Sequence, residues 1–166
     1  FRAVQRTRIK VTRVANQPMR RPRSEFIDSV LVSGGMNVAD RRIVEAFATV
    51  PREKFLAAGP WLLLGESGYE PTSDGDPIRL YQDVVVAIDP IKGINNGEPS
   101  LHMRLLAALA VQPGDRVLHI GTGTGYYTAI LAELAGRQGQ VTAVEFQPEL
   151  ADRLRQAVLR AARSHA

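Results

Sequence analysis

The spacing of four residues in this sequence is typical of a ligand-binding site: three glycines at alternate positions and a glutamate 20 residues after the last of them. The glycines are Gly121, Gly123 and Gly125 in RVLHIGTGTGYYTAIL (116–131), and the glutamate is Glu145. A backbone without side chains lets a ligand lie directly against it. A carboxylate at this spacing can accept hydrogen bonds from both hydroxyls of a ribose. The pattern therefore predicts a site for a nucleoside-containing cofactor.

The exact glycine spacing narrows the choice of cofactor. The dinucleotide fingerprint is GxGxxG, whereas this loop reads GxGxG with Tyr126 where the third glycine of that fingerprint would stand. The phosphate loop is also excluded, because no Gly-Lys-Ser/Thr follows. The loop looks like the S-adenosylmethionine site of class I methyltransferases. The alternative that remains open is that the glycines serve only tight packing.

Strands and helices alternate around this loop. The apolar runs 116–120 and 140–145 have the length and β-branched content of strands, and 126–135 and 148–163 have helical periodicity. Two strands joined by one helix form a right-handed βαβ unit with a parallel sheet. Ligands bind at the carboxyl ends of such strands, which is where the glycine loop lies.

The upstream half predicts helices and long loops. A helix should have Asn37 as its cap, carry Asp40 in its first turn and end at Pro51, and 59–77 reads as a loop. The run 83–89 reads as a strand. A second helix should follow Pro99 and reach about residue 110. We expect that helix to turn Leu101, Leu105 and Leu109 inward and to leave His102 and Arg104 on a solvated or loop-facing edge.

The amino-terminal charge is uneven. Residues 1–23 hold eight arginine and lysine side chains and no acidic ones, so 24–166 carry thirteen basic against seventeen acidic side chains. Because the basic stretch lacks aromatic interleaving, we interpret 1–35 as a disordered, dispensable leader rather than a nucleic-acid-binding arm. The chain has no cysteine, its three histidines are scattered, and no apolar run approaches the roughly 20 residues of a membrane span. These features predict a cytoplasmic protein without a metal site and without a membrane partner.

Three stretches resemble the protein-L-isoaspartate O-methyltransferase family: RRIVEAFATVPREKFL, PGDRVLHIGTGTGYYTAILAELAG and VTAVEFQPELADRLR. The resemblance covers roughly 36–160. It implies an α/β fold with an incomplete Rossmann-like, doubly wound parallel sheet, preceded by a helical and loop-rich subdomain. The expected organisation is a leader at 1–35, a subdomain with the substrate loop at 36–110, and part of the S-adenosylmethionine-binding domain at 111–166. The implied activity is methylation of a protein or peptide carboxyl group, with isoaspartyl residues as acceptors.

The resemblance also assigns roles to single residues. Gly121, Gly123 and Gly125 would line the methionine end of the cofactor, and Glu145 would hold its ribose. The remaining cofactor-binding residues would be His119, Thr122 and Phe146. The catalytic, acceptor side would consist of Asp83 and of the loop NNGEP (95–99), with Gly97 and Glu98.

Departures from the family pattern leave alternatives open. Gly97 stands where the family has a serine, so Gly97→Ser is expected to raise transfer to an isoaspartyl peptide. His119 stands where the family has an acidic residue. The sequence stops at Ala166, after only the second strand of the cofactor domain. We expect a sheet that ends there to leave one strand edge unpaired and one apolar face uncovered. The alternatives are a related methyltransferase with another carboxylate acceptor, or a non-catalytic fragment that binds nucleosides or nucleic acid.

Overall fold

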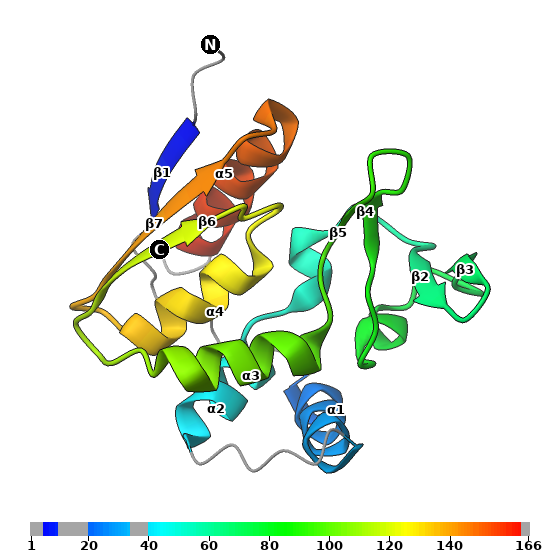
Figure 1. The fold of residues 1–166 in the computed structure, drawn as a ribbon, viewed down its shortest axis with the longest axis horizontal. Helices are drawn as coiled ribbons and strands as arrows, with labels where there is room; N and C mark the ends of the chain where they lie inside the picture. Colours follow the sequence, from blue (N-terminus) through cyan, green and yellow to red (C-terminus); the bar gives the residue numbers. More distant parts are fainter. Residues whose placement is uncertain (1–4, 10–19, 34–39, 164–166) are drawn as a thin grey trace.

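The carboxyl-terminal part of the chain folds as the sequence predicts. The computed structural model describes residues 5–9, 20–33 and 40–163. Its last four elements are β6 (Arg116–Ile120), α4 (Tyr126–Ala135), β7 (Gln140–Glu145) and α5 (Pro148–Arg163) (Figure 1). Strands β6 and β7 are parallel, with Val117 opposite Val141 and Ile120 opposite Val144. The βαβ unit that should carry a ligand at its strand ends is therefore present.

One face of this sheet is covered and the other is open. Along β6, residues 117 and 119 are half-buried, whereas 116, 118 and 120 are exposed. Helices α4 and α5 pack against the sheet, and the inward residues of β7 are buried. Since side chains alternate between faces along a strand, Leu118 and Ile120 lie on the opposite face, where they are 61% and 71% exposed. The expected uncovered apolar face is found there.

A third strand pairs with the other edge of β7. Strand β1 (Gln5–Ile9) runs antiparallel to β7, with Gln5 opposite Glu145 and Ile9 opposite Val141. The sheet order is β1-β7-β6. We expected 1–35 to be disordered, and β1 differs from that expectation because the backbone of an open strand edge can pair with a segment of almost any composition.

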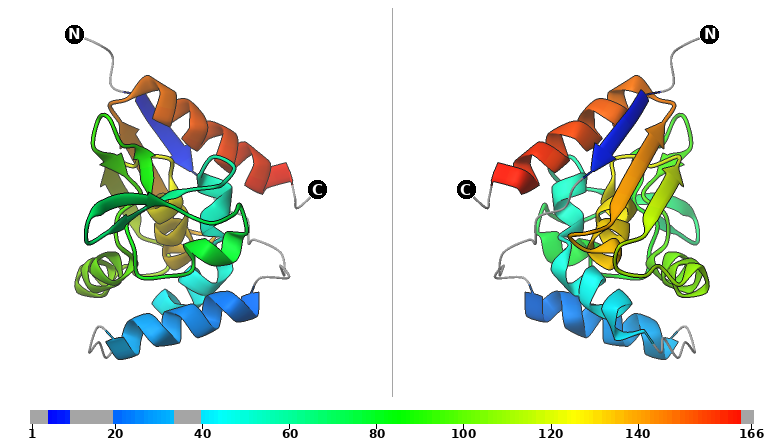
Figure 2. Two further views of the ribbon diagram at one scale, coloured as in Figure 1. Left: turned by 90° about the vertical axis from the view of Figure 1, so that its right-hand side faces the viewer. Right: turned by 90° about the vertical axis from the view of Figure 1, so that its left-hand side faces the viewer.

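Helix α1 (Arg20–Ser33) is a second departure from the expected leader. It packs on α2 (Arg41–Thr49) at the end of the molecule opposite β1 and α5 (Figures 1 and 2). Phe26, Ile27 and Val30 are buried in the main core. These apolar residues form a single stripe on an otherwise basic, polar helix, so the average composition of the segment concealed them.

The main core spans the expected subdomain boundary. It includes residues of α1 and α2 together with Tyr126, Ile130 and Val141. Helix α2 begins at its N-cap Asp40, whose Oδ1 accepts the Arg42 amide at 2.9 Å, and ends before Pro51 as predicted. Asp40 was predicted in the first turn and is instead the cap, and Asn37, the predicted cap, lies outside the described residues. The division at 110/111 stays a prediction.

Short elements fill the middle of the chain. They are η1 (Arg52–Phe55), β2 (Leu62–Gly65), β3 (Gly68–Pro71), η2 (Pro77–Leu80), β4 (Ala87–Asp89) and β5 (Ile94–Asn95). The predicted loop 59–77 contains the antiparallel β2–β3 hairpin, and only the end of the predicted strand 83–89 is a strand.

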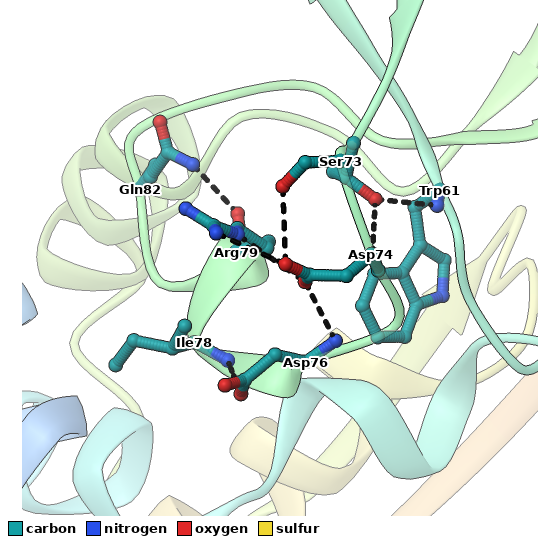
Figure 3. A network of polar contacts seen from close by, with 8 residues as sticks. Trp61, Ser73, Asp74, Asp76, Ile78, Arg79 and Gln82 are labelled. Carbon is teal, nitrogen blue, oxygen red and sulfur yellow. Dashed lines mark hydrogen bonds and ion pairs between the residues drawn. The ribbon is translucent and has the colours of Figure 1, made fainter.

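A network of polar contacts holds the segment that follows the β2–β3 hairpin in its turn conformation (Figure 3). The Asp74 carboxylate accepts hydrogen bonds from Arg79, from the Asp76 amide and from Ser73. The Arg79 hydrogen bond is the main cause that lowers the pKa of Asp74 to about 2. Asp74 also accepts, through its backbone oxygen, the Thr72 hydroxyl, which in turn accepts the Trp61 amide. Side chains therefore fix this turn-rich segment in place of a regular strand.

Helix α3 (Pro99–Leu109) has the predicted bounds but not the predicted inward face. Leu101, Leu105 and Leu109 are all exposed, whereas Met103 and Leu106 are buried. The buried residues stand three apart, and the exposed leucines four apart. Both stripes satisfy a helical period, so only the packing against α1 and α2 decided which one faces the core.

No helix within the described ranges has the length and apolarity needed to cross a membrane.

Arg23 connects α1 to the rest of the chain. Its side chain is 1% exposed, its Nε donates to the Ala48 carbonyl at 2.8 Å, and its guanidinium lies 3.9 Å from a Glu53 carboxylate oxygen. The Tyr81 hydroxyl accepts from Arg23 and donates to Glu53. This residue belongs to the segment that we expected to be dispensable.

We predict that Arg23→Ala destabilises the protein by about 3 kcal/mol, because it leaves the Ala48 carbonyl without its buried donor and removes the cation beside Glu53. Thermal unfolding followed by circular dichroism measures the loss. The matched control is Arg104→Ala, an exposed arginine on α3, which should change stability by less than about 0.5 kcal/mol. Equal effects of the two substitutions would restore the view of α1 as dispensable.

Candidate functional site

The glycine loop closes the carboxyl ends of β6 and β7. The amides of Gly121 and Thr122 both donate to the Val144 carbonyl, at 2.9 and 3.4 Å. Gly125 is the N-cap of α4. The loop thus lies at the strand end of a parallel pair, where the sequence predicted a ligand.

The side chain of Glu145 holds this loop through hydrogen bonds to backbone amides. The carboxylate is 6% exposed, its Oε2 accepts the Gly123 amide at 2.7 Å, and its Oε1 accepts the Gln147 amide at 2.9 Å. The sequence predicted a ribose ligand and not this anchoring role. Each carboxylate oxygen has two lone pairs, so one acceptor position per oxygen is left for a ligand hydroxyl.

The three positions of the loop require glycine for different structural reasons. All have positive φ, +72° at Gly121, +56° at Gly123 and +98° at Gly125. A Cβ on Gly121 would meet no atom within 4 Å, and one on Gly123 would meet only Ile88 Cδ1 at 3.9 Å. A Cβ on Gly125 would clash with Leu154 of α5. The third glycine therefore serves helix packing, and the first two leave the open space that a ligand needs.

Two hydroxyls on the loop fit a polar ligand. Thr122 Oγ1 and Thr124 Oγ1 are buried and have no hydrogen-bond partner among the described residues. An unpaired buried hydroxyl is costly, and such groups in native proteins usually await water or a ligand. Together with Glu145 and the open glycines, these donors fit the hydroxyl-rich and charged cofactor predicted from the sequence.

His119 and Phe146 complete the predicted cofactor set. His119 is half-buried, and its Nδ1 lies 2.8 Å from the Thr128 hydroxyl. Burial, more than the nearby His102, lowers the pKa of His119 to about 4, so the ring is neutral at pH 7. Phe146 is 66% exposed at the end of β7. His119 therefore brings a neutral ring, and Phe146 an open aromatic face, to the same sheet end.

The predicted acceptor loop is held by a buried arginine. Arg52 is 0% exposed and lies in η1. Its guanidinium donates to the Asn96 side chain at 2.8 Å, to the Gly97 carbonyl at 2.9 Å, and to the carbonyls of Leu80 and Val84 at 3.2 and 2.9 Å. One side chain thereby ties the loop to the preceding segment.

Tyr127 joins the acceptor loop to the cofactor side. It is the second residue of α4, directly after the glycine loop, and its hydroxyl donates to the Gly97 carbonyl at 3.3 Å. Burial raises the pKa of Tyr127 well above its ordinary value, so the hydroxyl keeps its proton. The two sides of the predicted site are therefore brought together through one hydrogen bond.

A side chain at Gly97 would strain the backbone and meet a neighbouring ring. Its φ is +60°, and a Cβ would clash with the ring of His102. The expectation that Gly97→Ser improves the site is therefore not supported, because serine at this position strains the backbone and displaces a packed ring.

Asp83 and Glu98 both serve the start of α3. Glu98 is the N-cap residue but makes no side-chain capping bond. The exposed Asp83 supplies it instead, accepting the Ser100 amide at 2.8 Å. The three predicted acceptor-side residues thus lie around one helix start.

Sequence reasoning missed the residues that organise this site: Arg52, Tyr127 and the packed ring of His102. Arg52 carried a signal, since it lies in VPREKF, a stretch on which the family resemblance rests. Tyr127 lies in a second such stretch, PGDRVLHIGTGTGYYTAILAELAG, whereas His102 lies in none of the three. The contacts of Tyr127 and His102 with Gly97 form only in the folded chain.

We predict that Arg52→Lys lowers the free energy of unfolding by about 3 kcal/mol, because an ammonium group cannot reach four acceptors that diverge around a planar guanidinium. Urea denaturation measures the change. Lys54→Ala, on the exposed side of the same turn, is the control and should be nearly silent. An unchanged unfolding midpoint in Arg52→Lys would mean that Arg52 does not hold the loop.

Comparisons with known proteins agree with this geometry. The sequence model of protein-L-isoaspartate(D-aspartate) O-methyltransferase matches residues 21–165. The protein-L-isoaspartate O-methyltransferase of Koribacter versatilis is 35% identical over 132 residues, which are 78% of this chain and 48% of the relative. That of Aeropyrum pernix is 35% identical over 139 residues, 84% of this chain and 46% of the relative. The chain thus spans about half the length of these curated relatives.

Solved structures are similar as well. One protein-L-isoaspartate O-methyltransferase has a TM-score of 0.64 and 25% identity, covering 84% of this chain and 39% of its own. A candidate enzyme of the same name from Plasmodium falciparum, in complex with S-adenosyl-L-homocysteine, has a TM-score of 0.61 and 19% identity, covering 84% and 56%. The fold is accordingly an incomplete Rossmann-like fold of the class I methyltransferase type. On the match of its sequence over residues 21–165, the chain belongs to the protein-L-isoaspartate(D-aspartate) O-methyltransferase family.

Proposed function

We propose that this chain carries the cofactor-binding loop and the acceptor loop of an S-adenosylmethionine-dependent O-methyltransferase that acts on carboxyl groups of proteins or peptides, with isoaspartyl residues as acceptors. A cytoplasmic location is part of the same proposal. The single observation that carries it is the buried Glu145 carboxylate beneath two glycines with open space above them, at the carboxyl ends of two parallel strands, in a chain of this family.

The cofactor side requires binding and orientation from the protein. When bound, S-adenosylmethionine supplies an electrophilic sulfonium methyl group. Gly121 and Gly123 allow the backbone to approach a ligand closely, and Glu145 has one free acceptor position on each oxygen for the ribose hydroxyls. The unpaired hydroxyls of Thr122 and Thr124 supply further polar contacts.

The acceptor side requires alignment more than acid or base catalysis. In-line methyl transfer depends on holding the attacking oxygen about 3 Å from the methyl carbon, and small misplacements are costly. Arg52 and Tyr127 both donate to the Gly97 carbonyl and so fix the loop relative to the glycine loop. A pocket of about 160 Å³ beside Thr124 of the glycine loop, lined also by Ile88 and Arg153, is the size of a side chain rather than of a whole ligand. This favours a peptide as the acceptor.

A second candidate function is methylation of a different carboxylate. The observation that favours it is the left-handed Gly97, where His102 leaves no room for a side chain that could orient an isoaspartyl group. The two functions differ only in the acceptor.

The test compares acceptors in the natural full-length protein. Labelled S-adenosylmethionine is offered with an isoaspartyl peptide, with its aspartyl counterpart, and with peptides that carry only a terminal carboxylate. We expect base-labile label on the isoaspartyl peptide. Label on another peptide alone would establish the second candidate, and label on none of them would reject carboxyl methylation.

We predict that Glu145→Ala weakens binding of S-adenosylhomocysteine by roughly 1.5 to 3 kcal/mol, since it removes a buried charged acceptor. Isothermal calorimetry measures the affinity, and Glu145→Gln, which keeps one oxygen for the Gly123 amide, should lose less. Glu149→Ala, an exposed glutamate on α5, is the matched control. If Glu145→Ala binds as tightly as the parent, the assignment of Glu145 to the ribose is wrong.

A further inference from the structure

The His102 ring is fixed from two sides beside the acceptor loop. It stacks on Tyr127 with ring centroids 3.5 Å apart and an angle of 5° between the planes. Its Nδ1 lies 2.8 Å from the Glu98 carbonyl oxygen. Because a carbonyl only accepts, Nδ1 must carry the hydrogen, and Nε2 of the neutral ring is unprotonated.

The same ring fills the space over Gly97. The three atoms nearest to a Cβ built on Gly97 all belong to His102, namely Cε1, Nδ1 and Nε2. The backbone of Gly97 is held independently, since its amide donates to the Asn95 side chain at 2.9 Å and its carbonyl accepts from Arg52 and Tyr127. The imidazole thus stands where residue 97 has no side chain of its own.

We propose that His102 is a positioning residue of the acceptor loop, and that its ring, clamped between Tyr127 and the Glu98 carbonyl, replaces the absent side chain of Gly97 and holds residues 95–98 in the geometry that receives the acceptor carboxyl group. The inference rests on the proposed function for its acceptor. It goes beyond that function by naming the side chain that shapes the acceptor end and by coupling the identity of residue 97 to that of residue 102.

The charge state of the ring has a consequence for the acceptor. Burial lowers the pKa of His102 below its ordinary value, so the ring is neutral at pH 7. A neutral ring whose only hydrogen is given to Glu98 offers no charge to an approaching carboxylate. His102 therefore acts through the shape of the loop rather than by attracting the anion.

A double-mutant cycle tests the coupling. Gly97→Ala should lower Tm by roughly 5 °C in the parent, both because alanine is strained at positive φ and because it meets the ring. In a His102→Ala background the second cause is gone, so the loss should be clearly smaller. Gly93→Ala is the matched control, because Gly93 has φ +68° and open space around it; its effect should be the same in both backgrounds. Equal losses for Gly97→Ala in the two backgrounds would overturn the proposal.

Two variants and a spectrum separate positioning from mere stability. His102→Phe keeps a ring over Tyr127 without the hydrogen bond, and His102→Asn keeps a donor near the Glu98 carbonyl without the ring. In the full-length protein, both should raise KM for the isoaspartyl peptide by about fivefold, with KM for S-adenosylmethionine unchanged. The ¹⁵N resonance of His102 Nε2 should be that of an unprotonated nitrogen at pH 7.

The outcomes distinguish the two levels of the proposal. No transfer from the parent to any peptide would reject the proposed function, and the cycle and the spectrum would still decide the placement of His102. Normal transfer with unchanged peptide KM in both variants would overturn the positioning role while leaving the function intact. A protonated Nε2 at pH 7 would overturn the clamped geometry.

Discussion

The buried guanidinium of Arg52 is the interaction on which the arrangement of the site depends. Burying a charge is expensive unless every donor is paired, and here the partners are neutral oxygens of Leu80, Val84, Asn96 and Gly97. The ring of Tyr126 lies 5.9 Å from the guanidinium carbon and adds a cation–π contact. Because these acceptors come from two loops that have little regular structure of their own, the arginine replaces a strand ladder as the element that fixes them. The acceptor loop is accordingly joined to the buried part of the molecule through Arg52.

A second buried arginine extends the same design to the amino-terminal helix. Arg23 on α1 reaches the Ala48 carbonyl, Tyr81 and Glu53, and Glu53 lies in the same short helix as Arg52. Burial, followed by the hydrogen bond to Glu53, raises the pKa of Tyr81 above its ordinary value, so this hydroxyl remains a donor. Through the neighbouring residues Arg52 and Glu53 of η1, the two arginines connect α1 on one side and the acceptor loop on the other to the same short helix.

In the glycine loop, a small number of residues serve both the packing of the fold and the proposed binding of a ligand. Glu145 first satisfies the amides of Gly123 and Gln147 and only then offers its remaining lone pairs. Gly125 admits Leu154 and so sets the distance between α4 and α5, whereas Gly121 and Gly123 border open space. A motif that reads as one signal in the sequence thus divides into a packing residue, two residues that leave room for a ligand, and an anchor beneath them.

The sequence alone determined the parts that depend on short-range order. The βαβ unit, the glycine loop, Glu145 at the end of its strand and the bounds of α3 and α5 all follow from periodicity, punctuation by glycine and proline, and fixed spacing. Tertiary structure decided between arrangements that these sequence patterns fit equally well. The basic composition of the first segment hid the apolar stripe of α1, and two equally periodic stripes competed for the inner face of α3. Arg52 and His102 acquire their roles from partners that they meet only in the folded chain. The contribution of a hydrogen-bond donor depends on the acceptors that surround it, and these come from distant parts of the sequence.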